Sequence, residues 1–305
     1  MAKVVVFGGS GFIGSHVSDE LTRRGHEVTI FDCVISKYLK PNQKMVIGDI
    51  LERDAVKAVV KGSDFVYHFA AIADIQEARE NPVEAANFNI MGTMFILDAC
   101  REYNIKRLVY SSTIYVYSDH GSFYRSTKQS CELFIENYQK EFNLDFTILR
   151  YGSLYGPRAN HFNFINNIIH QALIEKKIKR QGDGSEVRDY INVIDAANAS
   201  VDVLDADYKN SYVMITGPQT MKVKEILEMI KEMMNGEIEI EYQKGEFIGH
   251  YQITPYSFKP KVALKLIPKK YHDLGQGLLD CIYENYQTLK AEGKQMEYSK
   301  IQERE

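Results

Sequence analysis

The sequence predicts an α/β fold, in which a doubly wound parallel sheet is followed by a smaller α/β domain. Short apolar segments alternate with amphipathic ones through the first 150 residues, which is typical of parallel strands with helices on both faces of a sheet. The first apolar segment runs directly into a glycine-rich turn, residues 8–14. Polar residues follow several later apolar segments, and ligands of such sheets bind at the carboxyl ends of the strands.

The glycine-rich turn joins a predicted strand to a predicted helix. Residues 4–7 form a buried apolar run, and Ile13, Val17 and Leu21 recur at helical spacing. Glycines permit the tight turn and let backbone N–H groups approach a pyrophosphate at the positive end of the helix. A bare glycine pattern also fits an ordinary structural turn, but this context favours a Rossmann-type dinucleotide site. The expected cofactor contacts are Gly8, Gly11, Phe12, Ile13 and Gly14.

An acid follows at the distance expected of a dinucleotide site. Asp32 ends the next predicted strand, residues 27–31, eighteen residues after Gly14. Such an acid accepts hydrogen bonds from the adenosine ribose. Because its charge would repel a 2′-phosphate, NAD is expected as the cofactor in preference to NADP.

Composition excludes several other classes of protein. The chain has 305 residues, of which 45% are hydrophobic and 26% charged, and a net charge of −4. These values are those of a soluble globular protein without the basic surface that binds nucleic acid or an anionic membrane. No apolar run is long enough to span a bilayer, and the N-terminus leads into a strand rather than a signal peptide. The four scattered cysteines have no metal-ligand spacing, so no metal is expected, and they suggest reduced thiols in a cytoplasm. A cytoplasmic protein is therefore expected.

The remaining elements follow from apolar periodicity. In the first half, strands are predicted at 44–47, 64–69, 107–112 and 145–150, and helices at 53–61, 82–103 and 124–143. In the second half, helices are predicted at 163–174, 193–204, 223–234 and 273–286, and strands at 212–215 and 238–242. The basic run 175–180 is interpreted as a solvated helix end, His68 as a packing residue and His120 as a solvated loop residue. The charged tail, residues 291–305, is expected to be disordered.

A possible proton-transfer site follows the fifth strand. Tyr124 and Lys128 are four residues apart, so they face one side of the predicted helix. Alone, such a pair usually lies on the protein surface and has no catalytic role. Here it follows a glycine loop and a strand ending in Ser111, Ser112 and Thr113. A nearby ammonium favours the phenolate form of a tyrosine, and a Ser or Thr hydroxyl could hold a substrate oxygen beside it. These residues therefore predict proton transfer next to a hydride carrier.

These motifs resemble those of the extended short-chain dehydrogenase/reductases, in the NAD-dependent nucleotide-sugar epimerase and dehydratase group. The resemblance covers residues 3 to about 287. It rests on GGSGFIG (8–14), Asp32, GDI (48–50), HFAA (68–71), NIMGT (89–93), SSTIYVY (111–117), YRSTK (124–128), LRYGSLYGPR (149–158) and GDGSEVRDYINVID (182–195).

The resemblance assigns roles to particular residues. Tyr124 would be the general base or acid, Lys128 would hold the nicotinamide ribose, and Thr113 would be the catalytic hydroxyl. The further cofactor residues it implies are Asp49, Ile50, Phe69, Ala70, Ala71, Asn89, Ser111 and Tyr151. The substrate residues it implies are Thr113, Ser153, Arg158, Gln181 and Arg188, with a binding role left open for Arg180. It also implies a homodimer that pairs two helices, with Phe95, Ile96, Leu133 and Phe134 compatible with that interface or with a core.

Departures from the family pattern narrow the reaction. Relatives that dehydrate or decarboxylate often carry an acid directly after the Thr, whereas Thr113 is followed by Ile114 and Tyr115. The aromatic and amide residues usual before YGP are replaced by Gly152 and Ser153. The segment from Thr113 to Tyr124 spans only eleven residues, so either the active site is more open or its wall comes from elsewhere.

The first hypothesis is therefore an NAD-dependent epimerase of a nucleoside diphosphate sugar, acting at C4 through a transient keto sugar. The alternatives are a keto-sugar reductase or sugar dehydrogenase, a 4,6-dehydratase, and a non-catalytic NAD-sensing protein. The predicted domains are an NAD-binding domain at 1–150, to which 187–215 returns, and a substrate domain at 151–290.

Overall fold

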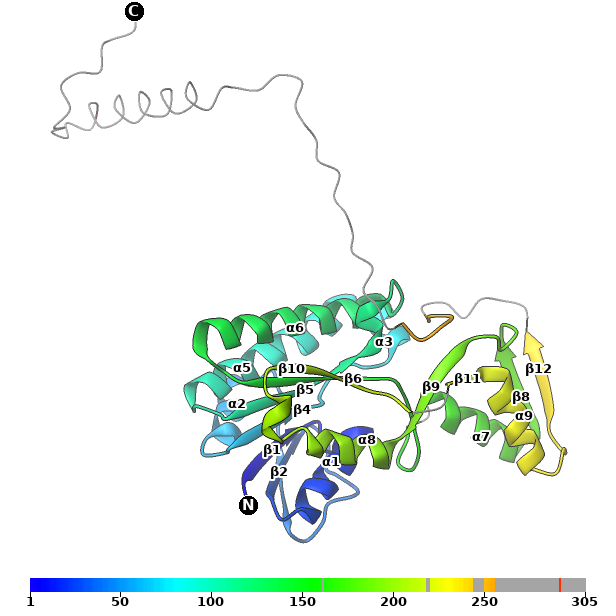
Figure 1. Cartoon of the computed structure of the whole chain (residues 1–305), viewed down its shortest axis with the longest axis horizontal. Coiled ribbons are helices and arrows are strands. Elements are labelled where there is room, and N and C mark those ends of the chain that lie inside the picture. The colour runs from blue at the N-terminus through cyan, green and yellow to red at the C-terminus, as the bar shows by residue number, and fades with distance from the viewer. Residues whose placement is uncertain (161, 218–219, 244–249, 256–290, 292–305) are drawn as a thin grey trace, which may run out of the picture. The chain divides into compact units, whose positions relative to one another are not determined.

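The computed structural model describes residues 1–160, 162–217, 220–243, 250–255 and 291 (Figure 1). Residues 1–259 form one compact unit. Its described part is an α/β fold built on a seven-stranded sheet with helices on both faces. This confirms the predicted fold class.

The sheet has the order β10-β6-β5-β4-β1-β2-β3, and every pairing in it is parallel. The chain winds outward from β1 in one direction and from β4 in the other, so a switch point lies between β1 and β4. Ligands of open parallel sheets bind at such a point, beyond the carboxyl ends of the strands. The strands are β1 (Lys3–Phe7), β2 (Glu27–Asp32), β3 (Gln43–Ile47), β4 (Phe65–His68), β5 (Arg107–Thr113), β6 (Phe146–Tyr151) and β10 (Ser211–Ile215).

Helices cover both faces of this sheet (Figure 1). On one face, the buried side chains Val56, Ile96 and Ile135 come from α2 (Arg53–Val60), α5 (Gly92–Glu102) and α6 (Ser122–Phe142). On the other face, α1 (Phe12–Arg23) and α8 (Val193–Asp202) pack with the sheet around Leu21 and Ala197. Apolar residues at helical spacing thus meet both sides of apolar strands, as in a doubly wound fold.

The helix predicted at 82–103 consists of three successive segments. These are α4 (Pro82–Ala86), the π-helical turn η1 (Asn87–Met91) and α5. Such turns often accompany functional sites. The short helix α3 (Ile75–Glu80) precedes them and was not predicted; Asp74 caps it by accepting a hydrogen bond from the Glu77 backbone N–H at 2.8 Å. The predicted helix at 124–143 is confirmed as α6.

The second half adds two smaller sheets. One has the order β11-β9-β7, and the other pairs β12 with β8 beside two helices. The strands are β7 (Ser153–Tyr155), β8 (Lys177–Gln181), β9 (Val187–Asn192), β11 (Thr220–Lys222) and β12 (Glu239–Gln243). The helices are α7 (Phe164–Glu175) and α9 (Val223–Met233), and the short helical turns are η2 (Ile114–Tyr117) and η3 (Ala206–Tyr208). Two elements of the second half belong with the seven-stranded sheet instead. Strand β10 pairs with β6, and helix α8 packs against the sheet.

One sequence prediction here was wrong. The run 175–180 is not a helix end throughout, because α7 stops at Glu175 and Lys176 turns the chain with a φ of +51°. Residues from Lys177 onward form β8, whose alternate residues Ile178 and Arg180 are buried. The density of charge in this run favoured a solvated helix end, but pairing with β12 makes the segment a strand. The predicted helix at 273–286 and all of the predicted tail except residue 291 lie outside the described residues.

Histidine 68 lies in the core, as predicted. It is 1% exposed, and its Nε2 atom lies 3.0 Å from the Thr93 hydroxyl. Burial lowers its pKa to about 3, so the imidazole is neutral at neutral pH. In the described residues, no helix is long and apolar enough to cross a membrane, and no group of His, Cys, Asp or Glu side chains is arranged to hold a metal ion.

Replacing a core leucine should destabilise the protein strongly. Leu97 of α5 is fully buried, so Leu97→Ala should lower the free energy of unfolding by about 2–5 kcal/mol. Leu173 of α7 is 65% exposed, and Leu173→Ala should change it by no more than about 0.5 kcal/mol. Urea denaturation of both variants measures the difference; equal losses would contradict the described packing.

Candidate active site

Two cavities open at the carboxyl ends of the sheet strands. The larger has a volume of about 1430 Å³ and the smaller about 520 Å³. They share part of the glycine loop and the residues after β4, so they form neighbouring parts of one site. Predicted residues lining the larger cavity are Gly8, Gly11, Phe12, Ile13, Gly14, Phe69, Ala71, Ser111, Thr113, Tyr124, Lys128, Tyr151, Ser153, Gln181 and Arg188. Those lining the smaller are Gly8, Gly11, Phe12, Asp32, Asp49, Ile50, Phe69, Ala70, Ala71 and Arg158.

The glycine loop is packed too closely to admit side chains. Gly8 has a φ of +74°, and a Cβ there would lie 2.5 Å from the backbone nitrogen of Ala70. A Cβ on Gly14 would lie 2.2 Å from the carbonyl oxygen of Gly8. The loop closes through a 3.1 Å hydrogen bond from the Gly11 N–H to the same oxygen. Backbone therefore forms the floor of the site at the start of α1, where a phosphate can approach.

Asp32 lies at the smaller cavity. Its carboxylate accepts hydrogen bonds from the backbone N–H groups of Ser10, at 2.9 Å, and Val34, at 3.1 Å. These contacts hold the acid between the glycine loop and the segment after β2. The carboxylate is thus placed beside the loop, as binding of a ribose next to a pyrophosphate requires.

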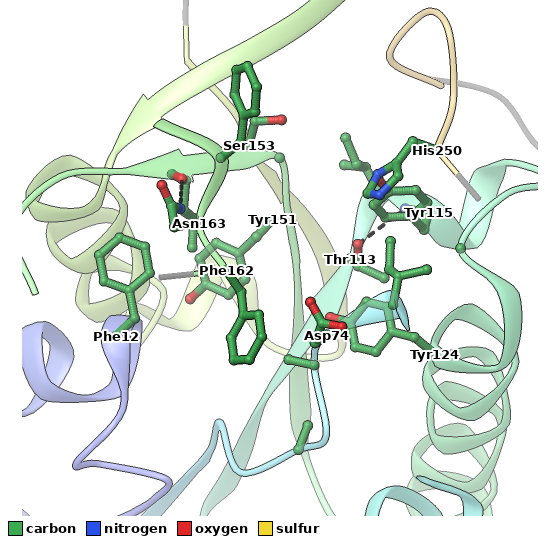
Figure 2. A pocket seen from close by; sticks show the side chains of 18 of the residues that line it. Phe12, Asp74, Thr113, Tyr115, Tyr124, Tyr151, Ser153, Phe162, Asn163 and His250 are labelled. Carbon is green, nitrogen blue, oxygen red and sulfur yellow. Dashed lines mark hydrogen bonds between the residues drawn. The ribbon is translucent and has the colours of Figure 1, made fainter. Parts of the chain in front are cut away.

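The proposed catalytic side chains meet in the larger cavity. Thr113 ends β5, and its side chain is hydrogen-bonded to that of Tyr124. The Lys128 ammonium donates a 2.7 Å hydrogen bond to the carbonyl oxygen of Ser111 and lies 5.8 Å from the centre of the Tyr124 ring. Figure 2 shows Thr113 and Tyr124 in the same part of the cavity. The helical spacing of Tyr124 and Lys128 therefore does bring both to the end of β5.

Burial acts on both titratable groups. It raises the pKa of Tyr124 to about 12, against the opposing effect of its hydrogen bond with Thr113. It lowers the pKa of Lys128 to about 8, while Cys131 and Glu132 raise it. Tyr124 is therefore protonated at neutral pH, and a phenolate there needs a positive charge close by.

A buried ion pair also holds the end of β5 in place. Glu132 lies four residues after Lys128 on α6; its carboxylate accepts a hydrogen bond from the Ser112 hydroxyl at 2.5 Å. It also accepts two from the Arg150 guanidinium, at 2.6 and 3.1 Å. Sequence analysis missed this network, although the four-residue spacing from Lys128 was a signal for it. The network ties the strand next to Thr113 to the helix that carries Tyr124.

Two predicted residues do not lie with the other residues of the same predicted role. Asn89 lines neither cavity; it is 1% exposed and bonds the backbone of Ile72 at 2.8 and 3.1 Å and the Thr127 hydroxyl at 3.0 Å. It therefore joins the segment after β4 to α6. Arg158 lines only the smaller cavity; it pairs with Asp19 at 2.7 Å and stacks on Tyr38. The structure places Arg158 beside the predicted cofactor residues, whereas Ser153, Gln181 and Arg188 lie together in the larger cavity.

Arg188 is the cation of the larger cavity best placed for an anion. It is 7% exposed, donates to the Val187 carbonyl oxygen at 3.0 Å, and lies 4.2 Å from the Tyr251 ring centre. Among the described residues it forms no ion pair with a carboxylate. Arg180, by contrast, pairs with Glu186 at 2.5 Å. A buried guanidinium without a carboxylate partner favours a negatively charged ligand.

The wall beside the short segment after Thr113 comes from elsewhere in the chain. Asp74 and the start of α3 line the cavity, as do His250 and Tyr251 from much later in the sequence. Sequence analysis missed all of these. Asp74 had a local signal, because it precedes α3 as a capping residue, but nothing in the sequence near His250 indicated that it would meet Tyr115.

Comparison with known proteins identifies the family. Residues 4–214 match the family described as "NAD dependent epimerase/dehydratase family". The chain belongs to this family. It is accordingly an NAD-dependent enzyme, and the resemblance seen in its motifs is confirmed.

Relatives with several activities share this fold. A protein of Methanocaldococcus jannaschii named "Putative UDP-glucose 4-epimerase" is 31% identical over 293 residues, which cover 86% of this chain and 94% of the relative. A UDP-N-acetyl-alpha-D-glucosaminuronate decarboxylase of Bacillus cytotoxicus is 28% identical, with 84% and 86% covered. Among solved structures, the UDP-glucuronic acid 4-epimerase of Bacillus cereus, with UDP-glucuronic acid and NAD, is 25% identical; its TM-score is 0.77, and 86% of this chain and 95% of that chain are covered.

The residues present fit NAD. At Gly8 and Gly14 the loop has no room for a side chain, so its backbone can approach a pyrophosphate at the start of α1. Asp32 lies where it can bond the adenosine ribose, with Asp49 and Ile50 in the same cavity. Lys128 and Tyr124 line the adjoining cavity, where the nicotinamide end would reach.

Gly14→Ala should lower NAD affinity at least about tenfold, because the new Cβ would lie 2.2 Å from the Gly8 carbonyl oxygen and displace the loop. Isothermal titration calorimetry with NAD measures the change. Gly62→Ala is the control, since Gly62 also has strained backbone (φ +80°) but has open space around it, away from both cavities. Unchanged affinity in Gly14→Ala would contradict the placement of the pyrophosphate.

The lowered pKa of Lys128 should appear in the pH dependence of stability. Folding lowers this pKa from 10.5 to about 8, so the desolvation cost is fully present below about pH 8. Between these values the unfolded chain binds more protons, so stability rises with pH. Relative to Lys128→Met, the wild type without NAD should gain up to about 3 kcal/mol as the pH rises from about 8 toward 10.5. Urea denaturation at several pH values tests this, and parallel curves for the two proteins would refute it.

Proposed function

We propose that the protein is an NAD-dependent epimerase of a nucleoside diphosphate sugar and acts at C4 through a transient keto sugar. The observation that supports this best is the meeting of Thr113, Tyr124 and Lys128 in a cavity beside the glycine loop. The positions directly after Thr113 carry Ile114 and Tyr115, so no acid follows it there. Relatives named as 4-epimerases of UDP-sugars support the same reaction.

Each side chain has a defined task in this reaction. Tyr124 takes the proton of the sugar hydroxyl and later returns it, while the Thr113 hydroxyl holds the same oxygen. The Lys128 ammonium favours the phenolate that Tyr124 must form. Bound NAD supplies reversible hydride transfer at the sugar carbon. The cavity would have to let the keto sugar turn over, so that it presents its opposite face and the carbon is inverted without net oxidation.

The nucleotide part of the substrate is assigned to the second half of the cavity. Arg188 is buried there without a carboxylate partner among the described residues, so it suits the diphosphate. Ser153 and Gln181 line the same cavity. In this proposal, residues 1–150 form the NAD-binding domain, to which 187–215 return, and 151–290 form the substrate domain. Arg188 would reach the diphosphate of the substrate from the returning segment.

A carboxylate in the cavity favours dehydration as the second candidate. Asp74 lines the larger cavity (Figure 2) and could move a proton at a neighbouring carbon. One of its oxygens already accepts the hydrogen bond from the Glu77 N–H that caps α3. This local role is sufficient reason for an acid at this position, so we place epimerisation first.

Incubation of the purified protein with UDP-glucose, UDP-galactose and the corresponding uronates tests the proposal. The expected product is the C4 stereoisomer, formed without consumption of added NADH. Stoichiometric loss of NADH would instead indicate a reductase. A 4-keto dehydrated product without any stereoisomer would indicate a dehydratase.

Tyr124→Phe should lower kcat for epimerisation by about 10²–10⁴, because it removes the proton-transfer group. NAD binding and unfolding temperature should change little, since the ring remains. Tyr138→Phe, which alters a tyrosine on the same helix away from the cavity, serves as the control with near wild-type kcat. A Tyr124→Phe variant with wild-type turnover would rule out the assigned role.

We also propose that the protein acts in the cytoplasm as a homodimer formed through α5 and α6. Leu133 and Phe134 on α6 are 61% and 37% exposed, which suits an apolar interface. Ile96 is fully buried in the core of its own chain and cannot take part.

A further inference from the structure

Two residues that the proposed mechanism does not use meet in the larger cavity. Tyr115 follows Thr113 by two positions, and His250 comes from the segment 250–255. The Tyr115 hydroxyl and His250 Nδ1 are hydrogen-bonded at 2.6 Å, and Figure 2 shows the two rings on the same side of the cavity as Thr113. Both residues line this cavity together with Tyr124.

Tyr115 is held close to the reacting end of the site. Its backbone N–H donates to the Thr113 hydroxyl oxygen at 3.3 Å. Its ring packs against Gly121, where a Cβ would lie 2.9 Å from the tyrosine Cδ1. A sugar oxygen held by Thr113 and Tyr124 therefore brings the rest of the sugar ring next to Tyr115.

Through Tyr251, Tyr115 is also connected to Arg188, the cation assigned to the diphosphate. The rings of Tyr115 and Tyr251 have centres 4.8 Å apart, and Arg188 lies 4.2 Å from the centre of the Tyr251 ring. The segment that carries His250 and Tyr251 is anchored to the strand of Arg188, since the Val187 N–H donates to the Gln252 carbonyl oxygen at 2.7 Å. Tyr115 thus lies between the proposed catalytic hydroxyls and the guanidinium, where the proposed function places the sugar.

The hydrogen-bonded pair carries no net charge at neutral pH. Burial, reinforced by Arg188, Arg180 and His120, lowers the pKa of His250 to about 4, while Asp74 opposes this. Burial also raises the pKa of Tyr115, with Tyr251 and Tyr124 adding to the rise and Arg188 opposing it. A neutral hydroxyl beside a neutral imidazole can exchange hydrogen bonds with a sugar hydroxyl but offers no counter-charge to an anion.

We propose that Tyr115 is a specificity-determining residue that hydrogen-bonds a hydroxyl of a neutral hexose, and that His250 positions it by fixing the orientation of its hydroxyl. This inference rests on the proposed function, because it assumes a nucleotide sugar in this cavity. Among the described residues the Tyr115 hydroxyl makes one hydrogen bond, to His250, and the oxygen has capacity for another.

The same geometry disfavours a sugar that carries a carboxylate. A buried carboxylate requires a cationic partner, and Arg188 is assigned to the diphosphate while Arg180 pairs with Glu186. Asp74 lies close enough to His250 to influence its pKa. A uronate carboxylate beside Tyr115 would therefore meet a neutral pair and a carboxylate of the same sign.

Steady-state kinetics of two variants test the proposal. Tyr115→Phe removes the hydroxyl, and His250→Asn removes the imidazole but keeps a polar group near Nδ1. For UDP-glucose and UDP-galactose, Tyr115→Phe should raise KM or lower kcat/KM about tenfold, with a smaller loss in His250→Asn. The inhibition constant of UDP, which lacks the sugar, should stay the same in both, and Tyr138→Phe should match the wild type throughout.

A second experiment compares neutral and acidic UDP-sugars as substrates. The wild type should turn over the neutral UDP-hexoses with higher kcat/KM than UDP-glucuronate or UDP-galacturonate, and Asp74→Asn, which keeps a capping side chain, should narrow that difference. Preference of the wild type for a uronate would overturn the proposal. So would an equal weakening of UDP and UDP-hexose by Tyr115→Phe, because the pair would then only support the cavity wall.

If the wild type epimerises none of these compounds, the proposed function fails. Calorimetric measurement of UDP-glucose and UDP binding then tests the sugar contact of Tyr115 separately. Tyr115→Phe that weakens binding of UDP-glucose but not of UDP would still support a sugar contact. Equal binding of UDP-glucose by variant and wild type would refute it.

Discussion

The hydrogen bond from the Lys128 ammonium to the Ser111 carbonyl oxygen joins helix α6 to the carboxyl end of β5. Lys128 is only 2% exposed, so its ammonium is removed from water and must be bonded within the protein. Because helix α6 is fixed here, Tyr124, one turn earlier, is brought to Thr113 on the same strand. The proposed chemistry depends on this junction between one helix and one strand end.

A second polar junction supports the first. Glu132, on the next turn of α6, pairs with Arg150 of β6 and also accepts a hydrogen bond from Ser112, the neighbour of Thr113. Removing one partner of such a buried pair leaves an uncompensated charge, which is far more costly than losing a surface ion pair. The same carboxylate raises the pKa of Lys128 against the effect of burial. Structural and electrostatic support for the site therefore come from one side chain.

Local motifs predicted residues that the structure brings together at the two cavities. Local turn, strand and helix geometry sets the positions of the glycine loop, Asp32 and the pair Tyr124–Lys128. Their spacing in the sequence is therefore enough to predict how they are arranged. Prediction was weaker where long-range pairing decides structure. The basic run after Glu175 forms strand β8 because β12 pairs with it. Arg158, predicted as a substrate residue, pairs with Asp19 of α1.

By itself, the sequence determined a doubly wound α/β fold, a glycine loop with an acid beside it, and a Thr–Tyr–Lys set at the end of the fifth strand. The physical reason is that each of these depends on residues close together in the chain. Only the tertiary structure decided what closes the sugar end of the cavity. Tyr115 and His250 are 135 residues apart, and their contact arises because the segment after β12 is bonded to β9. No local pattern of residues encodes such a meeting, since it depends on where two separately folded segments come to lie.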